Sequence, residues 1–248
     1  MANNIRYLYH AQTGIELIFC KNSTISYPLH NHVSVLTIGI ILDGSVVLTT
    51  NKETRVYKQN ETFAVFPYVP HSISAHNSYT LLSLCIDKNA INDVDVATIQ
   101  KRIGLLLMYA LNMEKINQYQ ILQLLNCLDE IADFSDWHLK DHNPYIHDLK
   151  RQLELYPECK LSVEEMAQNA FLSKYHFIRS FKAEVGLTPH QFQIQNRIRK
   201  AQRLIHEANT ITEVALTTGF CDQSHFIKQF EKYVGLPPLT YKSSSGTI

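Results

Sequence analysis

The sequence has few cysteines, no long apolar run and no net charge, and the first two absences exclude whole classes of protein. Its five cysteines, at positions 20, 85, 127, 159 and 221, form no C-x-x-C pair and no disulfide-scaffold spacing, which indicates free thiols in a reducing compartment. The best apolar run, Val33–Leu48, is interrupted by Asp43-Gly44 and is too short to cross a bilayer. The N-terminus lacks the basic patch and apolar core of a signal peptide. We therefore expect a soluble, cytoplasmic protein that does not enter a membrane.

The missing net charge conceals a small asymmetry between the two ends of the chain. From Tyr145 onward, thirteen Lys and Arg stand against ten Asp and Glu, a formal charge of +3, and the first 144 residues carry −3. Three positive charges are a weak electrostatic footprint for a nucleic-acid partner. The pattern of residues must therefore decide the function.

The first ninety residues have the pattern of a β domain. Short β-rich runs separated by turn residues lie at Glu16–Cys20, Val33–Leu42, Ser45–Thr50, Thr62–Phe66 and Tyr79–Ile86. Asp43-Gly44 between two apolar runs is a strong hairpin signal. Many short strands at close spacing predict a small antiparallel barrel or sandwich.

After Asp87 the apolar period becomes helical. It recurs at Ile99, Ile103, Leu106, Leu107 and Ala110, and again at Ile121, Leu124, Leu125, Leu128, Ile131 and Ala132. Phe134–Pro144 has the composition of a linker, and the rest is helical in pattern up to the Ser-rich tail. The predicted fold class is α+β: a β-barrel at residues 1–88, a helical connector and linker at 89–143, and an all-α domain at 144–248.

The α domain contains an internal repeat. Five residues of the first copy recur 49 positions later, pairing Ser173 with Asp222, Phe177 with Phe226, Phe181 with Phe230, Gly186 with Gly235 and Pro189 with Pro238. Ala167 matches Ala215 at an offset of 48, so the first copy has a turn one residue shorter. Such a duplication argues against a plain helical bundle whose outer faces are polar by chance.

Each copy predicts a short helix, a tight turn and a second helix. The first helices are expected at Ser162–Asn169, where Ser162 and Glu165 form a capping-box pattern, and at Thr212–Thr218. The second helices begin at the N-caps Ser173 and Asp222. A long helix, Pro189–Glu207, joins the copies. The aromatic pairs face inward, and the opposite faces are polar, with Lys174, Tyr175, Arg179 and Lys182 in the first copy and Gln223, Ser224, His225 and Lys228 in the second. That composition suits helices presented to a major groove.

The stretches LSVEEMAQNAFLSKYHFIRSFKAEVGLTP, RIRKAQRLI and ITEVALTTGFCDQSHFIKQFEKYVGLPPLTY resemble the DNA-binding domain of the AraC/XylS family. The resemblance runs from Leu149 to Lys242. It implies two helix-turn-helix units that dock in successive major-groove segments, about one helical turn apart. By matching positions it points to base contacts from Tyr175, Ile178, Arg179, Gln223, Ser224, Ile227 and Lys228.

The chemistry of these side chains suggests particular bases. Arg179 is the best candidate for a bidentate contact to guanine and Gln223 for one to adenine, each discriminating by roughly 1–3 kcal/mol. Phosphate contacts are expected from Lys174, Lys182 and Lys232. Glu231 lies where the family commonly has a basic residue, so its negative charge should weaken the contacts of the second unit with the DNA phosphates.

The front domain resembles the cupin-type sensing barrel of AraC-like regulators over about residues 5–88. The resemblance depends on Pro28, His30, His32, Gly39 and Gly44, and on the later Pro67, Pro70 and His71. His30 and His32, at i and i+2 on a strand, are expected on one face. With His71 they form a possible three-histidine metal site suited to zinc, nickel or iron.

A structural role for these histidines, or hydrogen bonds to an organic effector, is the alternative. Metal-dependent cupins add a Glu where this chain has Leu36 or Thr37, and His76 and Cys85 are weaker ligand candidates.

The resemblance favours a transcription regulator whose barrel binds a small effector. The effector would shift the balance between two arrangements of the domains, changing operator occupancy or contact with RNA polymerase. The alternatives are a metal-dependent cupin enzyme fused to a DNA-binding domain, and a ligand-free regulator whose barrel serves only for dimerisation. We expect no catalysis, because no catalytic constellation is present elsewhere. The connector helices either cover the barrel or form a homodimer seam at Ile121, Leu125, Leu128 and Ala132.

Overall fold

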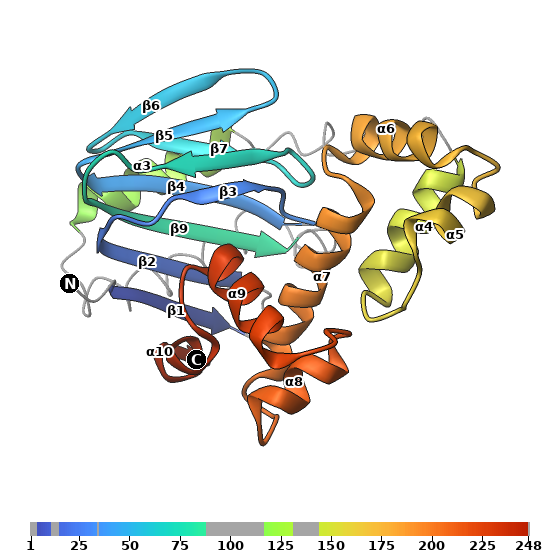
Figure 1. The fold of residues 1–248 in the computed structure, drawn as a ribbon. Helices are drawn as coiled ribbons and strands as arrows, with labels where there is room; N and C mark the ends of the chain where they lie inside the picture. The colour runs from blue at the N-terminus through green and yellow to red at the C-terminus, as the bar shows by residue number, and fades with distance from the viewer. Residues whose placement is uncertain (1–3, 11–14, 34, 88–116, 131–143, 248) are drawn as a thin grey trace. The chain divides into compact units, whose positions relative to one another are not determined.

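The computed structural model describes residues 4–10, 15–33, 35–87, 117–130 and 144–247. The chain divides into two compact units (Figure 1). Unit 1 comprises residues 1–138 and 243–248, and unit 2 comprises residues 139–242. Within the described residues, no helix is both long and apolar enough to span a membrane.

Unit 1 is built from two β-sheets. The six-stranded sheet has the order β10-β1-β2-β9-β4-β7, and the four-stranded sheet has the order β3-β8-β5-β6. The strands are β1 (Asn4–His10), β2 (Ile15–Ser23), β3 (Tyr27–His30), β4 (Val35–Asp43), β5 (Ser45–Thr50), β6 (Thr54–Lys58), β7 (Thr62–Val65), β8 (His71–Ser74), β9 (Tyr79–Asp87) and β10 (Ser245–Thr247). Among the described strands no ladder joins the two sheets, so the barrel is an open one.

The burial of the strands follows from what packs on each side. Along β5 buried and half-buried residues alternate, as period-2 side chains require. β4 is instead buried almost continuously from Leu36 to Ile41. The helix α3 (Gln118–Glu130) contacts β4 and β7, and its Leu124 is buried. β4 is therefore covered on both of its faces, which explains why its residues are almost all apolar.

A turn forms at Asp43-Gly44, but the prediction of a hairpin there is wrong, because β4 and β5 lie in different sheets and pair with other strands. Gly44 has a φ of +74° and joins β4 to β5. An added Cβ at this position would lie 2.5 Å from the carbonyl oxygen of Ser78. Glycine is required here both by the left-handed backbone and by the close approach of a second chain segment.

The five predicted β-rich runs are all strands, with ends shifted by at most three residues, and strands are also present where they were expected, at His30 and His71. The missed strands are β1, β6 and β10, of which β6 and β10 are short strands at sheet edges. The expectation that His30 and His32 share one strand is wrong, because β3 ends at His30. The first connector helix and the linker lie outside the described residues, whereas the second connector helix is α3.

Unit 2 is all-α. Its helices are α4 (Pro144–Leu155), α5 (Val163–Asn169), α6 (Lys174–Val185), α7 (Pro189–Leu204), α8 (Ile211–Thr217), α9 (Gln223–Val234) and α10 (Pro238–Ser244), the last of which extends two residues into unit 1. α7 is the central element, since it contacts α4, α6, α8 and α9 (Figure 1). The two copies of the repeat are thus attached to one shared helix.

Candidate functional site

The second helix of each copy, α6 or α9, is fixed at both ends by its own sequence. The Ser173 hydroxyl accepts the His176 N–H at 3.4 Å, and the Asp222 carboxylate accepts the His225 N–H at 2.7 Å. Gly186 and Gly235 end the helices in the left-handed conformation. Both predicted N-caps and both glycine stops are confirmed.

Aromatic pairs anchor the inner faces of these helices. Phe177 and Phe181 in α6, and Phe226 and Phe230 in α9, are all fully buried. Their rings lie 5.9 Å and 5.5 Å apart within each pair, and Phe181 also packs edge-to-face on Phe192 of α7. Burying a side chain of this size contributes about 1.5–3 kcal/mol. The anchors therefore fix which face of α6 and α9 is turned outward.

The turn between the two helices of each copy has the same geometry in both. Phe171 and Gly219 are equivalent, since both have positive φ, +55° and +88°. Leu172 N–H donates to Ala167 O, and Phe220 N–H donates to Ala215 O, each at 2.9 Å. The repeat therefore keeps its offset of 48 through this turn, and the extra residue of the second copy is the exposed Cys221.

The outward faces carry most of the side chains predicted to contact DNA. The exposed ones are Lys174, Tyr175, Arg179, Lys182, Gln223, Ser224, Lys228 and Lys232, while Ile178 and Ile227 are half-buried. Tyr175 is 81% exposed, an unusual state for a large aromatic side chain. The exposed Glu231 lies on α9 as well.

Two of these side chains already have partners within the chain. Lys174 forms an ion pair with Glu164 of α5, which raises the pKa of Lys174 and lowers that of Glu164. The Thr212 hydroxyl of α8 donates to Oε1 of Gln223 at 2.8 Å. The first helix of each copy therefore orients a side chain at the start of the second.

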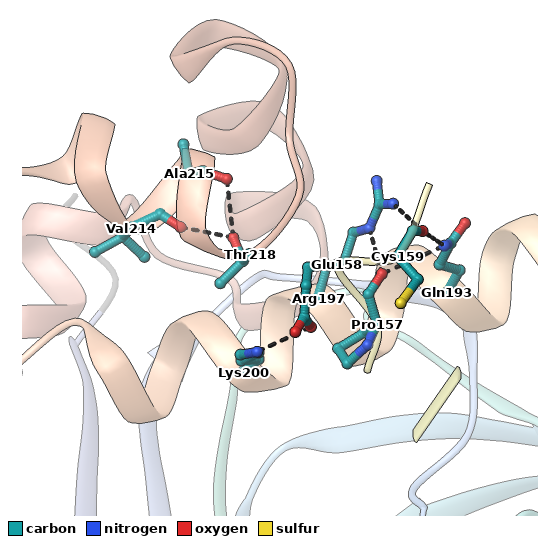
Figure 2. A network of polar contacts seen from close by, with 9 residues as sticks. All are labelled: Pro157, Glu158, Cys159, Gln193, Arg197, Lys200, Val214, Ala215 and Thr218. Carbon is teal, nitrogen blue, oxygen red and sulfur yellow. Dashed lines mark hydrogen bonds and ion pairs between the residues drawn. The ribbon is translucent and has the colours of Figure 1, made fainter. Parts of the chain in front are cut away.

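A polar network that the sequence analysis missed ties the copies to α7 (Figure 2). Arg197 Nε donates to Pro157 O at 2.7 Å, and its Nη2 donates to Cys159 O at 3.2 Å. Gln193 Nε2 also reaches both carbonyls, at 3.3 and 2.7 Å. Partial burial lowers the pKa of the Arg197 guanidinium. The loop between α4 and α5 is thereby held on α7.

The same network reaches the second copy. The Arg197 guanidinium lies 5.9 Å from the centroid of the Phe220 ring. A Cβ at Gly219 would lie 2.7 Å from Glu158 Cα, so the α8–α9 turn is in close contact with the α4–α5 loop. Lys200 pairs with Glu158 at 2.8 Å (Figure 2). Polar residues at i and i+4 of α7, Gln193 and Arg197, were the available sequence signal.

The three histidines predicted as a cluster come together in unit 1. His30 and His71 are directly opposite one another on β3 and β8, and His32 lies two residues beyond the end of β3. Ring centroids are 4.2 Å apart for His30 and His71, 5.2 Å for His30 and His32, and 5.0 Å for His32 and His71. One nitrogen from each ring lies within 4.8 Å of the others.

The weaker ligand candidates do not join this cluster. Leu36 is fully buried, and the Thr37 hydroxyl pairs with the Cys85 thiol at 3.6 Å across β4 and β9. His76 is exposed. Within the described part of the chain the cluster includes no carboxylate.

A second cluster of polar side chains, formed by Cys20, Tyr27 and Tyr79, lies in the interior of unit 1. Burial raises the pKa of the Cys20 thiol to about 12, although a hydrogen bond with Tyr27 lowers it in part. Burial also raises the pKa values of the Tyr27 and Tyr79 hydroxyls, and Tyr79 donates to Ile25 O at 3.0 Å. Cys20 is therefore held as a neutral thiol, without the reactivity of a thiolate.

Two domain families match the chain in the order expected from the folds of the two units. The family described as an AraC-like ligand binding domain matches residues 12–134, and the family described as a helix-turn-helix domain matches residues 166–244.

Several proteins are similar to this chain. The uncharacterized HTH-type transcriptional regulator YbfI of Bacillus subtilis is 25% identical over 231 residues, 83% of each chain. The probable transcriptional regulator LumQ of Photobacterium leiognathi is 35% identical over 68 residues, and the HTH-type transcriptional activator Btr of B. subtilis is 30% identical over 113 residues. These last two matches span only 27% and 21% of the relatives' lengths.

The fold as a whole is also found in a solved structure. The crystal structure of unsaturated fatty acid bound ToxT from Vibrio cholerae is similar over 98% of this chain and 97% of that chain, with a TM-score of 0.57 and 12% identity. That likeness shows that the order of a β-rich unit and a helical unit is shared. With an AraC-like ligand binding domain followed by a helix-turn-helix domain, the chain belongs to the AraC family of transcriptional regulators.

Proposed function

We propose that the chain is a sequence-specific DNA-binding regulator of transcription that uses α6 and α9 as its two recognition helices. The observation that carries the proposal is the duplicated arrangement, in which buried Phe pairs turn two capped helices outward from one body. A helix presented in this way fits the major groove. The proposed base contacts are Tyr175, Ile178, Arg179, Gln223, Ser224, Ile227 and Lys228.

Arg179 and Gln223 have the chemistry for bidentate base contacts. The guanidinium of Arg179 offers a planar fork of donors that fits O6 and N7 of guanine. The Gln223 oxygen already accepts from Thr212, but an amide oxygen has two lone pairs and its NH₂ remains a donor. Thr212 thereby holds the carboxamide in one orientation, which suits the paired acceptor and donor of adenine.

The lysines at the edges of the helices are proposed to contact phosphates. Lys182 and Lys232 are exposed near the ends of α6 and α9. Glu164 partly neutralises the charge of Lys174, so Lys174 contributes the least of the three lysines to phosphate binding. Glu231 precedes Lys232 and repels the same phosphates, so the first copy supplies more of the affinity.

We propose that unit 1 binds a small effector which changes DNA binding by unit 2. The match to an AraC-like ligand binding domain and the shared fold with fatty acid bound ToxT support this role. The effector acts only through its different affinities for two arrangements of the chain. Contact with RNA polymerase, pairing of two copies through the region of α3, and the absence of catalysis belong to the same proposal.

The test begins with selection of bound sites from random duplex DNA by the full chain, followed by affinity measurements on the selected site. Arg179→Ala should weaken binding roughly 5–150-fold and relax the preference at one base pair. Lys182→Ala should weaken binding to all duplexes alike and reduce the salt slope by about 0.9. Arg203→Ala, an exposed arginine on α7, is the control. Failure to enrich any sequence, or equal losses for Arg179→Ala and Arg203→Ala, would contradict the proposal.

A further inference from the structure

The three histidines of unit 1 form a cluster that takes no part in the proposed DNA binding. Its members come from a strand pair and from the segment that follows β3, so distant parts of the sequence converge on one point. All three rings lie with centroids 4.2–5.2 Å apart. Such convergence of three imidazoles is the donor set of many transition-metal sites.

Backbone carbonyls fix the tautomer of two of the rings. Nδ1 of His30 lies 2.7 Å from Pro28 O, and Nδ1 of His71 lies 3.0 Å from Val69 O. A carbonyl only accepts, so in each ring Nδ1 is the donor. In the neutral imidazole Nε2 then carries the lone pair. A ligand histidine that donates its other N–H to a carbonyl is the usual arrangement around a bound metal.

The segments that carry the histidines are tied to one another. The Tyr68 N–H donates to His32 O at 2.7 Å, and the Asn31 side-chain amide, which is fully buried, donates to Tyr68 O at 3.5 Å. The 66–70 turn, which leads directly into His71, is thereby fixed against the end of β3. The three rings are therefore held close together before any ligand binds.

We propose that His30, His32 and His71 bind one late first-row divalent metal ion through their imidazole nitrogens. At Zn–N distances of about 2.0–2.1 Å a tetrahedral site needs nitrogens about 3.3 Å apart. The observed upper limit of 4.8 Å leaves at most about 1.5 Å to close, within reach of side-chain rotation. Three ligands leave one coordination position open, and neutral imidazoles leave the charge of the ion uncompensated. The site therefore favours an anionic group as the fourth ligand, which names a class of effector for the proposed regulator.

The experiment uses the untagged full chain, stripped with a chelator and titrated with Co(II) as an optical probe, then with Zn(II) in competition. Wild type should bind about one ion per chain with visible absorption typical of a site of low coordination number. His32→Ala should bind roughly 100-fold or more weakly. His76→Ala, an exposed histidine of the same unit, should bind like wild type. His71 is buried and is left intact, because its replacement endangers the fold.

Equal thermal unfolding of metal-free wild type and His32→Ala establishes that the variant is folded. The inference is overturned if wild type binds no Co(II) or Zn(II) at micromolar concentration, or if folded His32→Ala binds as tightly as wild type. DNA affinity for the selected site is measured on the same metal-free samples. The metal inference alone fails when DNA binding is normal and metal binding is absent, whereas loss of site-specific DNA binding counts against the proposed function.

Discussion

Arg197 is the residue whose replacement tests most directly how unit 2 is held together. Its guanidinium donates to Pro157 O and Cys159 O and lies beside the Phe220 ring, so it contacts the α4–α5 loop and the second copy at once. Arg197→Met keeps a long apolar stem of similar length but removes the charge and the donors. The exposed Arg203, on the same helix, supplies the matched control Arg203→Met.

The expected loss can be worked out from the contacts. Hydrogen bonds from a charged donor contribute about 1.5–3 kcal/mol each. Gln193 still donates to both carbonyls after the replacement, so neither is left without a partner and the lower end of that range applies. A cation–ring contact at 5.9 Å is at the limit of the useful range and adds about 0.5 kcal/mol at most. Two such bonds and the ring contact together mean that Arg197→Met should lower the free energy of unfolding by about 3–3.5 kcal/mol.

Thermal unfolding followed by circular dichroism at 222 nm measures this loss, because unit 2 holds most of the described helices. For a unit of about 100 residues the expected decrease in Tm is roughly 12–28 °C. Arg197→Lys keeps the charge but cannot span both carbonyls, so about half of the loss should remain. Arg203→Met should change stability by less than about 0.5 kcal/mol. If Arg197→Met and Arg203→Met unfold at the same temperature, the guanidinium does not join the copies as argued.

Three further outcomes follow from the same unit. Gly219→Ala should destabilise it by about 2–4 kcal/mol, because φ is +88° and the new Cβ meets Glu158; wild-type stability in urea unfolding would contradict this. Burial raises the pKa of Glu158, but hydrogen bonds from Lys200 and a backbone amide outweigh it, so the pKa lies below the ordinary value. The ion pair of Glu158 and Lys200 therefore stabilises the fold fully above about pH 4.3 and less as pH falls below it. Between pH 7 and pH 3 the midpoint of urea unfolding should fall more for wild type than for Glu158→Gln. Equal pH dependence of the two midpoints would show that the ion pair does not stabilise the fold. Ser162→Ala, which removes the observed capping box with Glu165, should cost about 1 kcal/mol of unfolding free energy by the same assay. The control Ser224→Ala, at an exposed serine of α9, should cost almost nothing.

The sequence predicted the parts of the fold that depend on local chemistry. The structure confirms the capping box at Ser162, the N-caps Ser173 and Asp222 and the glycines that end the helices. Each of these features depends on residues that are close together in the sequence. The inward Phe pairs follow from helical spacing alone. The same locality explains why the register of the repeat could be found before the fold was known.

Long-range contacts were harder to predict. The Arg197 network joins residues about 40 positions apart through backbone carbonyls, so the polar pair Gln193 and Arg197 could mark a contact but not its partners. The convergence of His30 and His71 was expected from the family resemblance. The position of His32 beyond β3 was not, because strand ends are set by pairing with β8. β1 and β10 were missed for a similar reason, since a parallel pair between the two ends of the chain has no local signature.

The two outward helices of unit 2 are carried by a single chain and they are not alike. One presents Tyr175 and Arg179, and the other presents Gln223 and Lys228. Dimeric helix-turn-helix proteins bind palindromic sites because the protein itself has twofold symmetry. The two helices of this unit carry different side chains, so its two ends are not equivalent. We therefore expect the DNA site bound by one chain to have a direction along the duplex. Inverting that site at a promoter would leave the affinity unchanged and would turn the opposite end of the protein toward the transcription start.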